Sequence, residues 1–290
     1  MRSFLFVPAD SDRKLAKGAE SGADALILDL EDSVAADRKA GARDTALAYL
    51  KQHAGERRQQ LVVRVNALDT GLTDADLDVV VAGRPDSILL PKAEGGAAVI
   101  HLDAKLTARE AVHGLPEGGI KILALATETA ASLFVCGTYR GASPRLTGIT
   151  WGAEDLSAEL GSETNRDESG RFTSPYMLAR NLSLAAAASA RVQAIDTVYA
   201  DFRNMDGLRA EALEARLDGF TAKMAIHPAQ VAIINEVFTP APEEIAKAQA
   251  VVAAFAANPS AGVVGIGGVM YDRPHLIRAE RLLARAKGGA

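Results

Sequence analysis

The sequence predicts an α/β fold, a closed (β/α)8 TIM barrel followed by a C-terminal helical lid extension. Eight short apolar runs alternate with segments whose apolar residues have helical spacing. The runs are continuously apolar, which is typical of parallel strands covered on both faces. A count of eight favours closure into a barrel over an open sheet. The 290 residues, 48% of them hydrophobic, suffice for one such domain and a small additional element.

Each predicted strand is an apolar run that ends in polar or turn residues. Along the chain, the runs are SFLFVPA from residue 3, ALILDLED from 25, LVVRVNA from 61, SILLPKA from 87, KILALATE from 121, LTGITWGAED from 146, AIDTVYAD from 194 and FTAKMAIHP from 220. The stretches 35–50 and 177–192 have the spacing of helices between strands. The polar segment 161–174 is long enough to be a functional loop, and 83–86 is a second irregular connection.

The alternation stops after the eighth run, so we expect a barrel domain at 1–238 and a lid or oligomerisation segment at 239–290. Prolines followed by acidic residues at 240–244 indicate a helix start. A glycine-rich passage and a last amphipathic helix follow, a combination typical of a flexible lid whose apolar face meets a partner. The GIGG at 265–268 has the wrong glycine spacing for a dinucleotide-binding motif.

Composition and charge exclude several classes of function. The formal net charge is −5 and the Lys and Arg residues are scattered, so we expect neither nucleic acid nor a membrane as a partner. Cys136 is the only cysteine, which excludes an internal disulfide and a thiolate zinc site and favours core filling. No apolar run approaches a membrane span, and the opening MRSFLFVPAD is too short for a signal peptide. We therefore expect a soluble, cytoplasmic protein.

Polar residues gather where the predicted strands end, which is where a parallel barrel carries its active site. In strand order they are Asp29, Glu31 and Asp32, then Arg64 and Asn66, then Lys92 and Glu94, then Glu128, then Glu154 and Asp155, and finally Lys223 and His227. Several carboxylates around one mouth repel one another unless a cation neutralises them. An oxygen-rich site without cysteine favours magnesium, with manganese as the alternative.

Glu128 and Asp155 are the residues that we expect to bind this metal directly. We expect Glu31 and Asp32 to form an outer layer that holds metal-bound waters. Asp32 fits equally well as the cap of the following helix. His227 is interpreted as a strand-end histidine bonded to backbone in preference to a metal ligand.

The segment after Trp151 is expected to contact the substrate. Together with Trp151, Gly152 is expected to let a substrate approach the backbone, with packing of the barrel rim as the alternative. The next two residues, Ala153 and Glu154, belong to the same expected contact surface.

The motifs together resemble a known family. They are RSFLFVPADSDRKLAKG, ALILDLEDSVAADRKAGAR, VVRVN, ILLPKAE, ATETA, WGAEDLSAELG, GFTAKMAIHPAQV and VMYDRPHLIRAERLL. In their order, and over nearly the whole chain, they resemble the citrate lyase beta-subunit-like proteins. These belong to the larger group of HpcH/HpaI aldolases and malyl-CoA or citramalyl-CoA lyases.

The resemblance implies a magnesium-dependent barrel that makes or breaks a carbon–carbon bond between an acyl-CoA and a small 2-oxo acid. It places the metal ligands on Glu128 and Asp155, in agreement with the strand-end pattern, and a catalytic arginine on Arg64. It implies that Asp272 is the acid/base residue, carried over the barrel mouth by a neighbouring subunit's lid. A homo-oligomer, a trimer or a hexamer, is therefore expected.

The CoA phosphates call for cations, and the sequence offers five near the first two strand ends. They are Arg13, Lys14, Lys17, Lys39 and Arg43, with Asn66 as a further polar contact. An ordinary solvated helix face would look the same. The family usually has Gly where this chain has Ala9 and Ala222, and both departures lie at strand ends that bear on how the CoA arm is held.

Two other functions remain open. A metal-dependent pyruvate-type aldolase without CoA needs the same metal and Arg64 but neither Asp272 nor the cations. A non-catalytic subunit of a larger lyase assembly needs none of them. The presence of Arg64, Glu128, Asp155 and Asp272 in one chain argues against the non-catalytic role.

Overall fold

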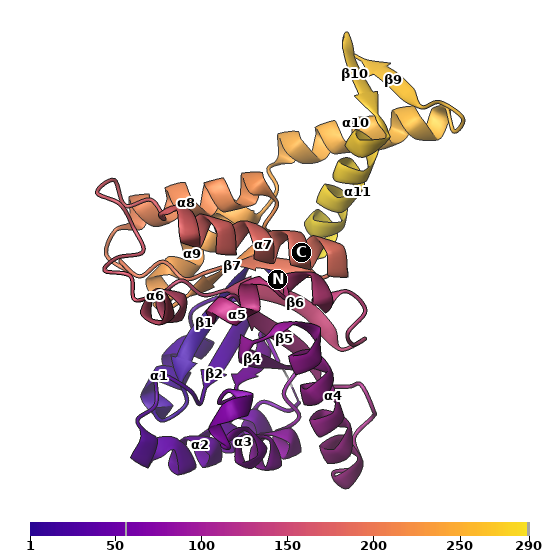
Figure 1. Cartoon of the computed structure of the whole chain (residues 1–290). Helices are drawn as coiled ribbons and strands as arrows, with labels where there is room; N and C mark the ends of the chain where they lie inside the picture. The colour runs from indigo at the N-terminus through magenta and orange to yellow at the C-terminus, as the bar shows by residue number, and fades with distance from the viewer. Residues whose placement is uncertain (56, 289–290) are drawn as a thin grey trace.

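The computed structural model describes residues 1–55 and 57–288, and its main feature is a closed barrel of parallel strands (Figure 1). Within these residues each strand pairs with the next along the chain, and the last pairs with the first. All eight predicted strands are confirmed in the described residues: β1 (Ser3–Pro8), β2 (Ala25–Asp29), β3 (Gln60–Arg64), β4 (Ser87–Ala93), β5 (Lys121–Ala126), β6 (Leu146–Trp151), β7 (Gln193–Asp196) and β8 (Ala222–Ala225).

Helices connect the strands and cover the outside of the barrel (Figure 1). The expected helices at 35–50 and 177–192 are confirmed as α2 and α7 with shifted bounds. The barrel helices are α1 (Asp12–Ala19), α2 (Lys39–Gln52), α3 (Thr73–Val80), α4 (Gly95–Val112), α5 (Ala130–Leu133), α6 (Glu154–Leu160), α7 (Ser174–Ala190), α8 (Met205–Asp218) and α9 (Pro228–Phe238). Among the described helices, none combines the length and apolar character that crossing a bilayer requires.

Short 3-10 helices and loops complete the connections. The 3-10 helices span 36–38, 68–70, 81–83 and 136–139. Both predicted irregular connections are confirmed. The connection at 83–86 contains Arg84, whose φ of 54° lies in the left-handed region, and the other joins α6 to α7 over residues 161–173.

The strands are buried on both faces, so the core has two layers. Alternate residues pack inside the barrel, among them Phe4, Ile27, Val62, Leu89 and Leu123. The residues between them, such as Leu26 and Leu90, pack outward beneath the helices. This arrangement is what the continuously apolar runs predicted, because a strand with one solvated face would alternate with polar residues.

The backbone ladder between β6 and β7 is short. β5 and β6 are paired as far as Ala126 and Trp151. In the described residues, β6 and β7 are paired at Gly148–Gln193 and Ile149–Ala194 and no further. At the carboxyl ends of these two strands, side chains and not backbone bonds must therefore hold the barrel wall together.

The C-terminal arm, residues 239–288, stands away from the barrel (Figure 1). It consists of α10 (Pro242–Ala257), an antiparallel hairpin of β9 (Val263–Ile266) and β10 (Val269–Asp272), and α11 (Arg273–Gly288). The arm has an apolar cluster of its own, which includes Val251, Phe255 and Val264. Residues 289 and 290 of the expected segment 239–290 lie outside the described residues.

The glycine-rich passage of the arm is a hairpin, where the sequence indicated a flexible link. Gly267 and Gly268 form its turn with φ of 57° and 79°, values that a two-residue hairpin loop requires and that glycine adopts without strain. The two strands are short, and Val263, Val269 and Met270 are exposed. The sequence of these two strands therefore lacks the alternation of polar and apolar residues that marks a half-buried strand.

Candidate active site

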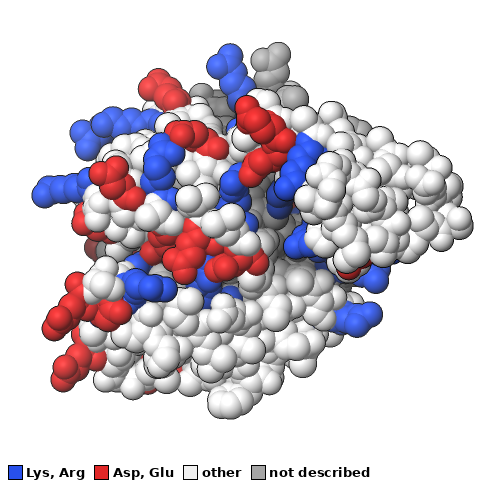
Figure 2. All heavy atoms as spheres, turned by 90° about the horizontal axis from the view of Figure 1, so that it is seen from above, with Lys and Arg blue, Asp and Glu red and all other residues white. Residues whose placement is uncertain are grey.

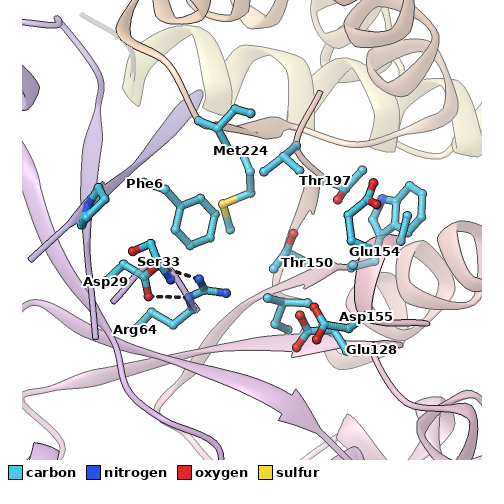
Figure 3. A pocket seen from close by; sticks show the side chains of 17 residues that line it. Phe6, Asp29, Ser33, Arg64, Glu128, Thr150, Glu154, Asp155, Thr197 and Met224 are labelled. Carbon is cyan, nitrogen blue, oxygen red and sulfur yellow. Dashed lines mark hydrogen bonds and ion pairs between the residues drawn. The ribbon is translucent and has the colours of Figure 1, made fainter. Parts of the chain in front are cut away.

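A cavity of about 280 Å³ opens at the carboxyl ends of the barrel strands. Six of the residues predicted for the site line it: Arg64, Glu128, Gly152, Ala153, Glu154 and Asp155. Figure 3 shows Arg64 and Asp29 on one side of the cavity and Glu128 and Asp155 on the other. Phe6 and Met224 contribute apolar surface between them. The strand ends therefore converge on one mouth, as the parallel barrel predicted.

Arg64, at the end of β3, is fixed by Asp29, at the end of β2. These two residues lie opposite each other in the ladder. Nε and Nη2 of Arg64 donate to the two carboxylate oxygens of Asp29, each at 2.7 Å, in the forked geometry that arginine offers a carboxylate. Burial tends to raise the pKa of Asp29, but the bonds from Arg64 hold that pKa below its ordinary value. Asp29, to which the sequence gave no role, is thus the residue that orients Arg64.

Glu128, which follows β5, and Asp155, in the first turn of α6, form a carboxylate pair (Figure 3). Glu128 is only 3% exposed, and its Oε2 accepts a hydrogen bond of 2.6 Å from the backbone N–H of Lys92. Burial, and then the charge of Asp155, raise the pKa of Glu128 to about 8. Without a cation, Glu128 is therefore mostly neutral near pH 7, and a bound cation would favour its ionised form.

Lys92, at the end of β4, brings a positive charge to this carboxylate pair. Its Nζ donates to Glu31 Oε1 at 2.7 Å and lies 3.1 Å from Asp155 Oδ1. Burial alone would lower the pKa of Lys92. The hydrogen bond to Glu31 and the nearby carboxylates together have the larger, opposite effect, so this pKa lies above its ordinary value. The sequence placed Lys92 at a strand end but gave it no role, because its partners come from other elements.

Glu31 lies between two cations. Its Oε2 is 2.9 Å from Nη1 of Arg64, yet in the described residues no hydrogen bond of good geometry reaches this buried oxygen. Burial raises the pKa of Glu31, although Arg64 opposes the shift. Asp32 is more exposed, 3.9 Å from Arg64 and 3.8 Å from Lys92. The alternative that Asp32 caps the next helix is wrong, because the helical turn at 36–38 has no side-chain cap.

The donor set at the mouth fits a small divalent cation. In the described ranges, no group of three or more His, Cys, Asp or Glu side chains is arranged to hold a metal. A small, hard cation keeps several waters and needs only one or two carboxylates, which Glu128 and Asp155 provide. A Cβ at Gly152 would lie 2.8 Å from Cγ of Glu128, so this glycine makes room for the pair. Metal binding by this pair stays a prediction.

Two family models match the chain. The model of the HpcH/HpaI aldolase/citrate lyase family matches residues 2–228. The chain belongs to this family. A second model, described as a C-C bond lyase of the TIM-barrel fold, matches residues 173–288 and so includes the whole C-terminal arm.

Similar proteins match nearly the whole length of the chain. The citrate lyase subunit beta of Haemophilus influenzae is 35% identical over 290 residues, 99% of this chain and 97% of that protein. The (3S)-malyl-CoA thioesterase of Cereibacter sphaeroides is 36% identical over 288 residues, 99% of this chain and 94% of that protein. The solved structure of CitE from Mycobacterium tuberculosis in complex with magnesium, acetoacetate and coenzyme A has a TM-score of 0.78 and 33% identity, over 99% of this chain and 98% of that chain. The resemblance in the motifs is confirmed.

Three of the predicted CoA-binding residues of this HpcH/HpaI family chain form hydrogen bonds with other residues of the chain. Asn66 is buried, donates to Leu30 O and Asp76 Oδ2, and accepts from Nζ of Lys39. Lys39 also donates to two backbone carbonyls after β2. Arg43 donates to buried Asp76 at 2.7 Å. All three residues are thus engaged within the chain, and their assignment to CoA stays a prediction.

Other predicted residues do not line the cavity. Arg13, Lys14 and Lys17 are exposed side chains of α1. In the described residues none of the three forms an ion pair, so their assignment to CoA stays a prediction. Asp272 of β10 does not line the described cavity, and its Oδ1 lies 2.5 Å from Nδ1 of His275. That hydrogen bond lowers the pKa of Asp272 below its ordinary value.

His227, Cys136 and Lys223 have structural partners in this HpcH/HpaI family chain. Nδ1 of His227 accepts from the backbone N–H of Ala229 and caps α9, which agrees with the backbone-bonded interpretation. Cys136 is buried and burial raises the pKa of its thiol, as core filling implies. Lys223 is fully buried behind the sheet and Ala222 packs inside the barrel.

Proposed function

We propose that this chain is a magnesium-dependent carbon–carbon lyase that cleaves or forms a β-hydroxyacyl-CoA thioester such as citramalyl-CoA or malyl-CoA. The other reactants are an acyl-CoA and a small 2-oxo acid. The observation that carries the proposal is the cavity in which Arg64 faces the buried carboxylate of Glu128 and the partly exposed carboxylate of Asp155. The similarity to a citrate lyase subunit, to a malyl-CoA thioesterase and to CitE bound to magnesium and coenzyme A supports it.

Magnesium, with manganese as the alternative, fits the oxygen donors of the cavity. Glu128 and Asp155 would hold the ion, and Glu31 and Asp32 would accept hydrogen bonds from its waters. When bound, the ion supplies Lewis-acid stabilisation of the substrate oxygen that changes between alkoxide and ketone. To hold the ion, Glu128 would have to lose its proton, because burial and the charge of Asp155 raise its pKa to about 8.

Arg64 would stabilise the negative oxygen of the substrate from the opposite side of the cavity. Its bonds to Asp29 use two of its five N–H donors and fix the plane of the guanidinium. A donor that is fixed before the reaction needs no reorganisation as charge develops, which is the largest single contribution in many enzymes. Gly152, Ala153 and Glu154 would line the substrate on the side of the metal ligands.

Asp272 is the proposed acid/base that moves the proton at the α-carbon of the acyl-CoA, a contribution of about 10² to 10⁴-fold. In its own chain, Asp272 does not line the cavity. The arm that carries it stands away from the barrel (Figure 1). Ala284 and Arg285, near the end of α11, share a separate cavity with Met1 and Arg2, which precede the amino end of β1. We therefore propose that a neighbouring subunit supplies Asp272.

The surface of the arm supports this assembly, a homo-oligomer such as a trimer or a hexamer. Acidic and basic side chains lie interspersed over the barrel face in Figure 2, whereas the arm, the lobe at the right, carries few charges there. Val263, Val269 and Met270 of the hairpin are 49%, 54% and 66% exposed. Apolar side chains exposed on a projecting element are typical of a surface that meets another subunit. Arg13, Lys14 and Lys17 would meet the CoA phosphates.

The test is a mixing experiment with two chains that are each inactive alone. An Asp272→Ala chain keeps an intact barrel, and an Arg64→Ala chain keeps an intact lid. Mixed oligomers should recover part of the magnesium-dependent cleavage of malyl-CoA or citramalyl-CoA, measured as release of the 2-oxo acid. If subunit exchange is verified and no activity returns, Asp272 does not act from a neighbouring subunit. Activity of the parent on free hydroxy acids, and none on their CoA thioesters, would favour the aldolase without CoA.

A further inference from the structure

A cluster of charged side chains is buried behind the barrel wall, outside the cavity. Lys223 of β8 is fully buried, and its Nζ donates to Asp196 Oδ2 at 2.6 Å and to Glu211 Oε1 at 3.0 Å. Asp196 lies opposite Lys223 in the β7–β8 ladder, and Glu211 comes from α8. Burial lowers the pKa of Lys223, but Asp196 and Glu211 raise it above its ordinary value, so the ammonium stays charged.

Burial of such a cluster is costly, and apolar residues of similar size would often give an equally stable wall. The cluster therefore calls for an explanation other than stability. Its contacts supply one, because each carboxylate uses its second oxygen to bond another residue, Trp151 at the edge of the cavity or Arg166 in the loop 161–173.

The first of these contacts holds the end of β6. Oδ1 of Asp196 accepts a hydrogen bond of 2.8 Å from Nε1 of Trp151, the last residue of that strand. In the described residues the backbone ladder between β6 and β7 ends at Ile149. The bond from Trp151 thus joins the two strands where the ladder does not. Residues 152–155, which include the proposed metal ligand Asp155, follow Trp151 directly.

The second contact holds the loop 161–173. Oε2 of Glu211 accepts from Nη1 of Arg166 at 2.8 Å, and the same nitrogen donates to Gly170 O at 2.7 Å. The guanidinium of Arg166 lies over the ring of Phe172 at 3.8 Å. Phe172 in turn meets the ring of Trp151 edge to face, with centroids 5.0 Å apart. The loop and the end of β6 are therefore connected twice, once through the buried ions and once through the rings.

We propose that Lys223 is a positioning residue that couples the loop 161–173 to the segment 152–155 through Glu211 and Asp196. The metal-ligand part of this statement rests on the proposed function. With Lys223 in place, Asp196 holds Trp151 and Glu211 holds Arg166, so an ordered loop and a correctly placed Asp155 occur together. Without it, both carboxylates lose their shared cation and each contact loosens.

Lys223→Met tests the coupling, because methionine approximates the length of the side chain without the charge. Trp151 is the only tryptophan, so intrinsic fluorescence reports on this position alone. We expect a red-shifted emission and easier quenching by acrylamide in the metal-free protein. We also expect faster tryptic cleavage after Arg166 and Arg171, and magnesium affinity that is about 10-fold weaker by calorimetry.

Arg145→Met is the matched control. Arg145 is also a buried cation held by two carboxylates, Glu110 and Asp103, and it precedes β6 at the opposite end of the barrel. This variant should lose stability in urea but keep the emission, the loop cleavage and the magnesium affinity of the parent. If the two variants change these three readouts alike, Lys223 contributes stability and not positioning.

Arg166→Gln tests the same coupling if Lys223→Met does not fold, because Arg166 is partly exposed and its loss spares the buried cluster. It should raise cleavage after Arg171 and also change the emission of Trp151. Unchanged emission would overturn the coupling. If the parent itself binds no magnesium, the proposed function fails, while the fluorescence and the cleavage still decide whether the loop and Trp151 are linked.

Discussion

Replacing Glu128 with Gln should stabilise the metal-free protein at alkaline pH. Glu128 is buried beside Asp155, and its pKa is about 8 in the folded protein against an ordinary value of 4.5. The folded state then holds a proton that the unfolded state has already lost. Stability must therefore fall as the pH rises through this window, and it reaches its lower level once Glu128 ionises above about pH 8.

The size of the effect follows from the separation of the two pKa values. Each pH unit over which the folded state holds one extra proton costs about 1.4 kcal/mol. Between pH 6 and pH 9 this amounts to about 3 kcal/mol, most of it lost by pH 8. Glutamine has nearly the same shape and can still accept the hydrogen bond from the backbone N–H of Lys92. The variant should lack this part of the pH dependence.

The assay is urea denaturation in a chelator at pH 6 and pH 9. The difference in unfolding free energy between the parent and Glu128→Gln should change by about 3 kcal/mol across the two values. Glu94→Gln is the control, because Glu94 is a neighbouring carboxylate that is exposed. Saturating magnesium should remove the alkaline loss in the parent but not affect the Gln variant. Parallel pH profiles of the parent and Glu128→Gln in the chelator would refute the burial reasoning.

Other substitutions at the mouth test separate contacts. Arg64→Lys keeps a positive charge but cannot make the forked bonds to Asp29, so turnover should fall roughly 10²-fold with a smaller change in metal affinity; near-parental turnover would make Arg64 structural. Gly152→Ala places a methyl group 2.8 Å from Cγ of Glu128 and should weaken magnesium binding by calorimetry. Lys92→Met removes a cation that competes for the same carboxylates, so magnesium should bind more tightly, and weaker binding would instead show that Lys92 positions a ligand.

The barrel was predictable because each strand carries its own signal. A strand buried on both faces is apolar at most positions, and all eight runs are largely apolar before their polar ends. Lys223, buried in the middle of β8, is an exception. The hairpin of the arm was not predictable in the same way. Val263, Val269 and Met270 are apolar but exposed in the folded chain. The sequence of these strands therefore lacks the pattern of buried apolar residues from which a strand is predicted. The pair Gly267–Gly268 was the remaining local signal, and it fits a two-residue hairpin turn.

The site was predictable as a gathering of residues but not as a set of contacts. Parallel strands bring their carboxyl ends together, so Glu128 and Asp155 could be placed at one mouth from the sequence. Which cations remain free depends on partners from distant segments. Arg43 looked available until the structure placed Asp76 of α3 beside it. Likewise Lys39 is bound by oxygens that follow β2 and β3.

The balance of charge at the mouth explains why a strand ends in three acidic residues. Glu154 also lines the cavity, without an ion pair in the described residues; the ionisable groups that interact with one another there are five carboxyl groups and two cations: Asp29, Glu31, Asp32, Glu128 and Asp155, with Arg64 and Lys92. If all are ionised, three negative charges are in excess. Protonation of Glu128 lowers the excess to two, whereas a divalent cation lowers it to one and leaves Glu128 free to bind as an anion. Because the proposed substrates are themselves anions, they should enter only after the cation has bound.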